Sequence, residues 1–62
     1  MKTNIKVVFK DGSECTFDAN CFSIKAEGFF SLEYEDEDDN SKLVAYVSVY
    51  EVRYLKFVEV EE

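Results

Sequence analysis

The residues best suited to chemistry in this 62-residue chain are the carboxylates of one short stretch, EYEDEDDN, at residues 33–40. Its eight positions hold six acidic residues and no Lys or Arg. The six acids are Glu33, Glu35, Asp36, Glu37, Asp38 and Asp39. So dense a negative charge can hold a cation, repel itself into an extended loop, or attract a basic surface on another molecule.

The acidic stretch resembles the start of a calcium-binding loop but lacks two of the residues that such a loop requires. Asp36, Asp38 and Asn40 have the spacing that begins an EF-hand calcium loop. Ser41, however, replaces the turn glycine of such a loop, and Val47 replaces its bidentate Glu. The stretch is therefore not an EF-hand, and weak binding of Ca²⁺ or Mg²⁺ without a preformed cage stays open as an alternative.

The residues needed for common catalytic mechanisms are missing. The chain has no His, which excludes Ser-His-Asp and Cys-His arrangements within one molecule. Its only two glycines, Gly12 and Gly28, are too few for a glycine-rich phosphate loop. A carboxylic general acid needs a desolvated pocket, for which so short a chain has little room. We expect no enzymatic activity and no cofactor.

The two cysteines, Cys15 and Cys21, point to packing rather than chemistry. The neighbouring carboxylate of Glu14 disfavours the thiolate that a nucleophilic Cys15 would need. Their five-residue separation is not the tight spacing of a structural zinc site, and two ligands make only half a tetrahedral set unless a symmetric dimer completes it. We expect both thiols to be reduced and to lie in the core.

Composition bounds the class of protein. Fourteen acids against seven bases give a net charge of −7, which disfavours direct binding to nucleic acid or to an anionic membrane and favours a basic partner. Six Phe and four Tyr supply enough apolar surface for a folded domain. Lys6 and Lys10 interrupt the only apolar run near the N-terminus, and no stretch approaches the roughly 18 residues that span a bilayer. We expect a cytoplasmic protein that forms one small domain over residues 1–62.

Alternation of apolar and polar residues predicts the elements that position the acidic stretch. Residues 5–9 alternate as a first strand, and Asp11-Gly12 is a strong hairpin signal. The pattern resumes at Cys15 and slips by one residue near 20–22, which indicates either a bend in one long strand or the end of that strand and the start of another.

Beyond that slip, three further strands are expected. Phe30, Leu32 and Tyr34 alternate as one strand, which runs into an acidic loop at 35–41. The β-branched and aromatic run that follows is too long for one strand, so we place strands at 42–48 and 52–60, with a helix over 48–58 as the alternative. The prediction is an all-β fold: a five-stranded antiparallel meander that forms a small, partly open barrel.

The segments IKVVFKDG, ECTF, VAYV and VRYL together resemble small SH3-like barrels, particularly short proteins of phages and Firmicutes prophages. The resemblance covers most of the chain, and no binding residue carries over from it. It implies an SH3-like barrel and, by analogy, a phage-type inhibitor such as an anti-CRISPR or anti-restriction protein acting in the host cytoplasm.

The function expected is binding without catalysis. Glu33, Glu35 and 36–39 would imitate the phosphates of a nucleic-acid strand and occlude a basic nucleic-acid-binding surface of another protein. Phe29, Tyr46 and Tyr50 would be exposed apolar anchors, since a small barrel cannot bury both faces of every strand. Two alternatives remain: a structural or regulatory homo-oligomer, such as a homodimer, whose acids only keep it soluble, and the weak divalent-cation binder.

Overall fold

The computed structural model describes residues 2–61 and builds them into six β-strands. They are β1 (Lys2–Phe9), β2 (Glu14–Phe17), β3 (Cys21–Lys25), β4 (Phe29–Glu35), β5 (Ser41–Ser48) and β6 (Val52–Val60). The predicted all-β class is confirmed, and the predicted break between two C-terminal strands falls at residues 49–51. The alternative of a helix over 48–58 is wrong. Over the described range, no helix could cross a membrane.

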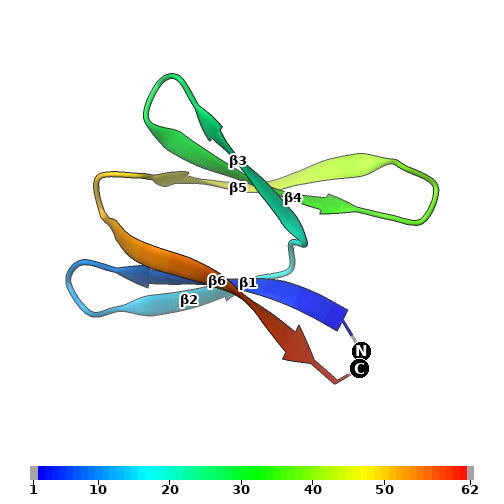
Figure 1. The fold of residues 1–62 in the computed structure, drawn as a ribbon, viewed down its shortest axis with the longest axis horizontal. Coiled ribbons are helices and arrows are strands. Elements are labelled where there is room, and N and C mark those ends of the chain that lie inside the picture. Colours follow the sequence, from blue (N-terminus) through cyan, green and yellow to red (C-terminus); the bar gives the residue numbers. More distant parts are fainter. Residues whose placement is uncertain (1, 62) are drawn as a thin grey trace.

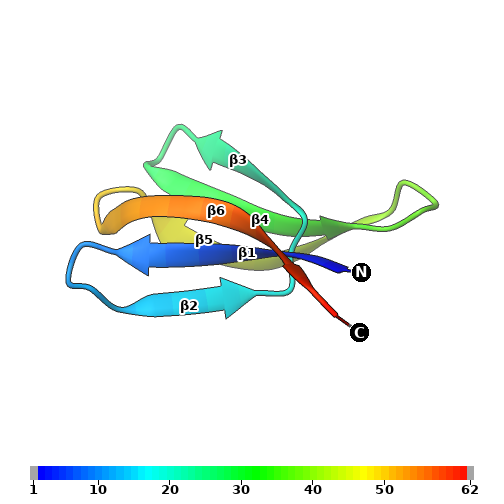
Figure 2. The ribbon, with the colours of Figure 1, turned by 60° about the horizontal axis from the view of Figure 1, so that its bottom comes forward.

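The strands form two small antiparallel sheets (Figure 1). One sheet has the order β2-β1-β6 and the other the order β3-β4-β5, so β1 and β4 are the central strands. The chain crosses between the sheets twice, after β2 and after β5 (Figure 2). Every neighbouring pair within a sheet is antiparallel, as the alternation and the short turns predict.

The first hairpin turn is built by the side chain of Asp11. Its Oδ1 accepts hydrogen bonds from the backbone N–H of Ser13 at 2.8 Å and from the Ser13 hydroxyl at 2.6 Å. These two bonds, the hydroxyl bond first, lower the pKa of Asp11. Gly12 supplies the left-handed backbone with a φ of 94°. The hairpin predicted from Asp11-Gly12 is confirmed.

The core joins residues of both sheets. Ile5 and Val7 on β1, and Leu32 on β4, have no exposed surface. Cross-strand neighbours extend this cluster, because Ile5 lies opposite Phe17 on β2 and Val7 lies opposite Leu55 on β6. The rest of the buried cluster comprises Ala19, Val47 and Val52, with Phe9, Phe17, Phe30, Val44, Ala45 and Leu55 packed partly buried against it.

The predicted count of five strands is wrong, because the chain breaks between β2 and β3. The N–H of Ala19 donates to the carbonyl of Phe17 at 2.9 Å, a tight local turn that no continuous strand can contain. Ala19 is fully buried, so this turn is anchored in the core. The phase slip therefore marks the end of one strand, β2, and the start of another, β3, and is not a bend in one long strand.

Two further expectations are corrected. The sheets do not close into a barrel: β5 and β6 follow one another in the chain but belong to different sheets. Cys15 is exposed rather than buried, because it lies on the four-residue edge strand β2 opposite the buried Val7. Cys21 is half-buried, and its thiol donates to the carbonyl of Glu33 at 3.4 Å.

Candidate functional site

The acidic stretch forms the turn of the β4–β5 hairpin, which extends beyond the sheets at one end of the molecule (Figure 1, far right). The loop itself is residues 36–40, one residue shorter at each end than the predicted 35–41. Glu35 and Ser41 are the last and first residues of the flanking strands and lie opposite each other in the ladder. All five loop residues are exposed, so their carboxylates face solvent.

The acidic loop is a hydrogen-bonded turn, which corrects the expectation that repulsion extends it. Oδ1 of Asp36 accepts from the backbone N–H of Asp38 at 2.9 Å and from that of Asn40 at 3.1 Å. The N–H of Asp36 donates to the carbonyl of Asn40 at 3.0 Å, and the N–H of Asp39 donates back to the carbonyl of Asp36. Asp39 takes a left-handed backbone with a φ of 63°, which Asp tolerates better than most residues. One carboxylate thus organises the loop that carries the others.

Asn20 anchors the base of the acidic loop to the chain crossing between the sheets. Its side-chain Nδ2 donates to the carbonyl of Glu35 at 2.8 Å, and its Oδ1 accepts from the N–H of Glu35, also at 2.8 Å. Its backbone N–H donates to the carbonyl of Glu33 at 2.9 Å. Asn20 therefore imitates one residue of a neighbouring strand and fixes where β4 ends.

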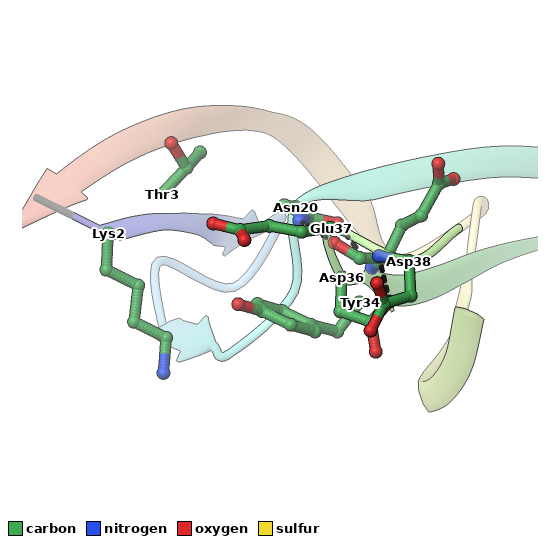
Figure 3. A pocket seen from close by; sticks show the side chains of 8 residues that line it. Lys2, Thr3, Asn20, Tyr34, Asp36, Glu37 and Asp38 are labelled. Carbon is green, nitrogen blue, oxygen red and sulfur yellow. Dashed lines mark hydrogen bonds between the residues drawn. The ribbon is translucent and has the colours of Figure 1, made fainter. Parts of the chain in front are cut away.

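An open groove of about 680 Å³ runs beside the acidic loop. Figure 3 shows that Lys2 and Thr3 lie on one side of it and the acidic residues on the other, with Glu37 pointing across toward Lys2 and Thr3. Nζ of Lys2 lies 2.8 Å from a carboxylate oxygen of Asp18 and 5.8 Å from the centre of the Tyr34 ring. The remaining lining residues are Asn20, Glu35, Asp36 and Asp38.

Glu33 lies apart from this groove, on the outer face of the β3-β4-β5 sheet. Its Oε2 accepts a hydrogen bond of 3.0 Å from the hydroxyl of Ser31, which is itself buried. Burial, and then the charges of Glu33 and Glu35, raise the pKa of the Cys21 thiol. The field of the acidic stretch therefore reaches the neighbouring strand, although Glu33 does not line the loop's groove.

The predicted anchors lie at the other end of the same hairpin. Phe29 and Tyr46 are 42% and 61% exposed, and their rings meet edge to face with centres 6.5 Å apart. Together with Lys25 and Glu27, they line a shallow apolar groove of about 450 Å³. Tyr50 lies in the β5–β6 turn, 74% exposed, with its ring against the backbone of Gly28.

The structure therefore separates the predicted site residues into two groups. Phe29 and Glu35 are the first and last residues of β4, so about 20 Å of extended strand lies between the aromatic pair and the acidic loop. Within each group the predicted residues do meet. No single compact pocket brings the two groups together, and a partner that contacts both must cover the length of the hairpin.

Sequence reasoning missed four residues of the acidic groove: Lys2, Thr3, Asn20 and Tyr34. The alternation pattern placed Tyr34 on the core side, and it is half-buried at the edge of the groove. Asn20 coincides with the phase slip, which was the one available signal of a special role there. Lys2 is distant in the sequence, and only the antiparallel fold brings it near the loop.

No three His, Cys, Asp or Glu side chains among residues 2–61 are arranged to hold a metal ion. Comparison with known proteins finds no family model, no curated protein and no solved structure that matches the chain.

Proposed function

We propose that the protein is a non-catalytic binding module whose acidic loop, 36–40, docks on a basic surface of another protein. The observation that carries the proposal is the order of the loop: one carboxylate, that of Asp36, satisfies its backbone N–H groups. Glu37, Asp38 and Asp39 are then exposed on a turn that is already folded. A pre-ordered charged surface loses little conformational entropy when it binds.

The net charge of −7 supports a basic partner over an acidic one. Clustered carboxylates steer association with a positively charged cleft and raise the rate of encounter, an effect that salt weakens. Surfaces that bind nucleic acid are the most strongly basic clefts on proteins, because they must neutralise phosphates. The partner we propose is a nucleic-acid-binding protein whose basic surface the acidic loop occludes.

The aromatic pair would supply the second contact. Phe29 and Tyr46 are exposed and already packed against each other, so their apolar surface can be buried by a partner with little rearrangement. Since this pair lies about 20 Å from the acidic loop, a partner that uses both is expected to bind along the whole β4–β5 hairpin.

The finer fold assignment, a partly open SH3-like barrel, belongs to the same proposal. If β2 and β3 are counted as two halves of one strand bent at residues 18–20, five antiparallel strands remain in the order β6-β1-β2/β3-β4-β5, which lacks the β5–β6 pairing of the expected meander and is open at that point. With that assignment comes the proposed biological setting, a phage-type inhibitor acting in the host cytoplasm.

The test is a pull-down from a lysate of the cells in which the protein acts, using two charge-matched variants. The loop variant carries Glu35→Gln, Glu37→Gln, Asp38→Asn and Asp39→Asn, and keeps Asp36 because that side chain holds the turn. The control variant removes the same number of charges from exposed sites outside both proposed contacts, through Gln at Glu14, Glu51, Glu59 and Glu61.

The proposal predicts that the wild type and the control variant retain the same nucleic-acid-binding protein and that the loop variant does not. Added DNA should release that protein, since both compete for one basic surface. If the loop variant retains the partner as well as the wild type does, the acidic loop is not the binding surface and the proposal fails.

A further inference from the structure

The strand β6 has features of an interface that the proposed function leaves unused. It is the longest strand, with nine residues, and it lies at the edge of its sheet with β1 as its only neighbour in that sheet. A long edge strand presents unpaired N–H and C=O groups that can pair with another strand. Natural proteins protect such an edge with proline, shortness or charged side chains. This chain has no proline and β6 is long, and the charges along β6 are those of Arg53, Lys56 and Glu59.

Apolar side chains gather along this edge. Phe57 is 52% exposed, and its ring centre lies 5.9 Å from that of Phe22 on β3, which is 40% exposed. Ile24, the next residue of β3 on the same face, is 68% exposed. On the other face of β6, Tyr54 and Val60 are also exposed. The edge therefore joins an unpaired backbone to apolar surface from both sheets.

The sequence of β6 is complementary to itself in one antiparallel register. In a two-fold pairing centred on Phe57, the two Phe57 side chains meet, Tyr54 lies opposite Val60 of the second copy, and Lys56 lies opposite Val58. Just beyond, at the register shift of β6, Arg53 donates a hydrogen bond of 3.3 Å to the carbonyl of Lys10 in its own chain. The register brings Arg53 level with Glu61 of the second copy, which places opposite charges near each other twice across the axis.

The neighbouring registers are worse. Centring on Lys56 sets two lysines directly against each other, which destabilises a sheet. Centring on Val58 sets both Phe57 and Leu55 opposite acids, Glu59 and Glu61, whereas the register centred on Phe57 sets only Leu55 opposite Glu59. Centring on Leu55 sets Glu51 opposite Glu59. Because the two faces of a strand alternate, only such whole-residue centres keep the faces of the joined sheets aligned.

We infer that β6 pairs with β6 of a second copy of this chain, in the register centred on Phe57. The dimer has one continuous six-stranded sheet across the axis and a cluster of Phe22 and Phe57 side chains from both copies. Burying half of a few aromatic side chains per copy gives an interface at or below about 1,200 Å², so we expect a dissociation constant on the order of micromolar. The acidic loops lie on other strands and stay free.

Disulfide trapping tests the register. In a Cys15→Ser, Cys21→Ser background, Phe57→Cys places two thiols opposite each other across the axis, within the Cα separation that a disulfide requires. Glu59→Cys is the matched control, since in this register residue 59 lies opposite residue 55 and the two engineered thiols are about 14 Å apart along the strands. Under mild oxidation, Phe57→Cys should form covalent dimer at least about tenfold faster than Glu59→Cys.

Sedimentation of the unmodified protein gives the second readout. It should show a monomer–dimer equilibrium that Arg53→Glu weakens several-fold and that Arg53→Glu with Glu61→Arg restores. Tyr46→Asp, on the other sheet, should leave the equilibrium unchanged. A protein that sediments as a monomer at millimolar concentration overturns the inference, and so do equal rates of trapping at residues 57 and 59. Either result would mean that, if the edge of β6 pairs with another strand, that strand comes from a different protein.

Discussion

The two ends of the β4–β5 hairpin are both exposed, but they are held in different ways. At one end, the acidic loop is ordered by hydrogen bonds: Asp36 satisfies the turn, and Asn20 fixes the last residue of β4. At the other end, Phe29 and Tyr46 pack ring against ring, and Tyr50 packs on Gly28. At the acidic end, Asp36 holds the turn, and the carboxylates of Glu37, Asp38 and Asp39 are exposed around it. At the other end, the exposed aromatic rings themselves make the contacts.

This difference explains how a short chain can present two kinds of surface without a large core. A polar turn costs little to keep exposed when its own side chains satisfy its backbone. Aromatic side chains keep apolar surface exposed at the cost of some stability, which a binding partner can recover by burying it. Both ends depend on the middle of β4, where Leu32 has no exposed surface.

The largest effect is expected from breaking the part that the two ends share. Leu32→Ala removes a fully buried side chain and should lower the free energy of unfolding by about 2–5 kcal/mol. A core of this size supplies only about 3–5 kcal/mol in total, so the variant should be largely unfolded. Ile24→Ala, at a position 68% exposed, should change stability by less than about 0.5 kcal/mol. Urea denaturation followed by circular dichroism measures both, and equal losses would contradict the placement of the core.

A smaller effect is expected at the aromatic end from Gly28→Ala. Gly28 has a φ of 88°, and a Cβ there would lie 3.0 Å from Cε2 of Tyr50. The left-handed backbone alone should cost about 1–2 kcal/mol, as it should at Gly12, where φ is 94° and the space is open. Only Gly28→Ala should also displace the Tyr50 ring, which NMR shifts of its ring protons would report. Unchanged Tyr50 shifts would contradict the contact.

At the acidic end, Asn20→Ala should cost about 1–2 kcal/mol, because it removes two side-chain hydrogen bonds to the Glu35 backbone. The effect should be local, with faster amide exchange at Glu35 and in the loop 36–40 than in β6. Asn20→Asp keeps an acceptor for the Glu35 N–H but sets a carboxylate oxygen against the Glu35 carbonyl in place of the donor, so its loss should be at least as large as that of Asn20→Ala. Uniformly faster exchange across the chain would mean that Asn20 supports the fold as a whole and not the loop.

The smallest expected effect is on the reactivity of a cysteine, which reports the electric field of the acidic stretch and not the stability of the fold. Cys15 is exposed, while burial, Glu33 and Glu35 raise the pKa of the Cys21 thiol above its ordinary value of 9.0. Because the thiolate is the reactive form, iodoacetamide should modify Cys15 first, and Cys21 should react appreciably only as the pH rises past 9.0. Glu33→Gln with Glu35→Gln should speed the reaction of Cys21 and leave that of Cys15 unchanged, as mass spectrometry of the labelled peptides would show. Equal acceleration at both cysteines would argue against a local field.

Much of the fold follows from alternation and turn chemistry. The first hairpin is encoded by Asp11-Gly12, and the strands near the C-terminus by β-branched and aromatic residues around the break at 49–51. The exposure of Phe29, Tyr46 and Tyr50 follows from the same alternation and from the small size of the core. These features are local, so a sequence pattern can carry them.

What could not be predicted depends on contacts between distant residues. The break at residues 18–20 brings Ala19 into the core, as the alternation indicates, and pairs Asn20 with Glu35. The phase slip marks the position of the break, but nothing in the alternation identifies Glu35 as the partner of Asn20. Cys15 fits the core pattern, yet it is exposed because its strand lies at the edge of a sheet. Order in the acidic loop arises from the hydrogen bonds of Asp36, which a count of like charges does not reveal.

The central claim is that the acidic loop binds a basic surface through its charge. The most direct test is calorimetric titration of the retained partner with the loop variant and with the charge-matched control variant, over a series of salt concentrations. The loop variant should lose most of the affinity and most of its dependence on salt, while the control variant keeps both close to wild type. Equal affinity and equal salt dependence for the two variants would show that only the net charge matters, and would contradict a dedicated acidic site at residues 36–40.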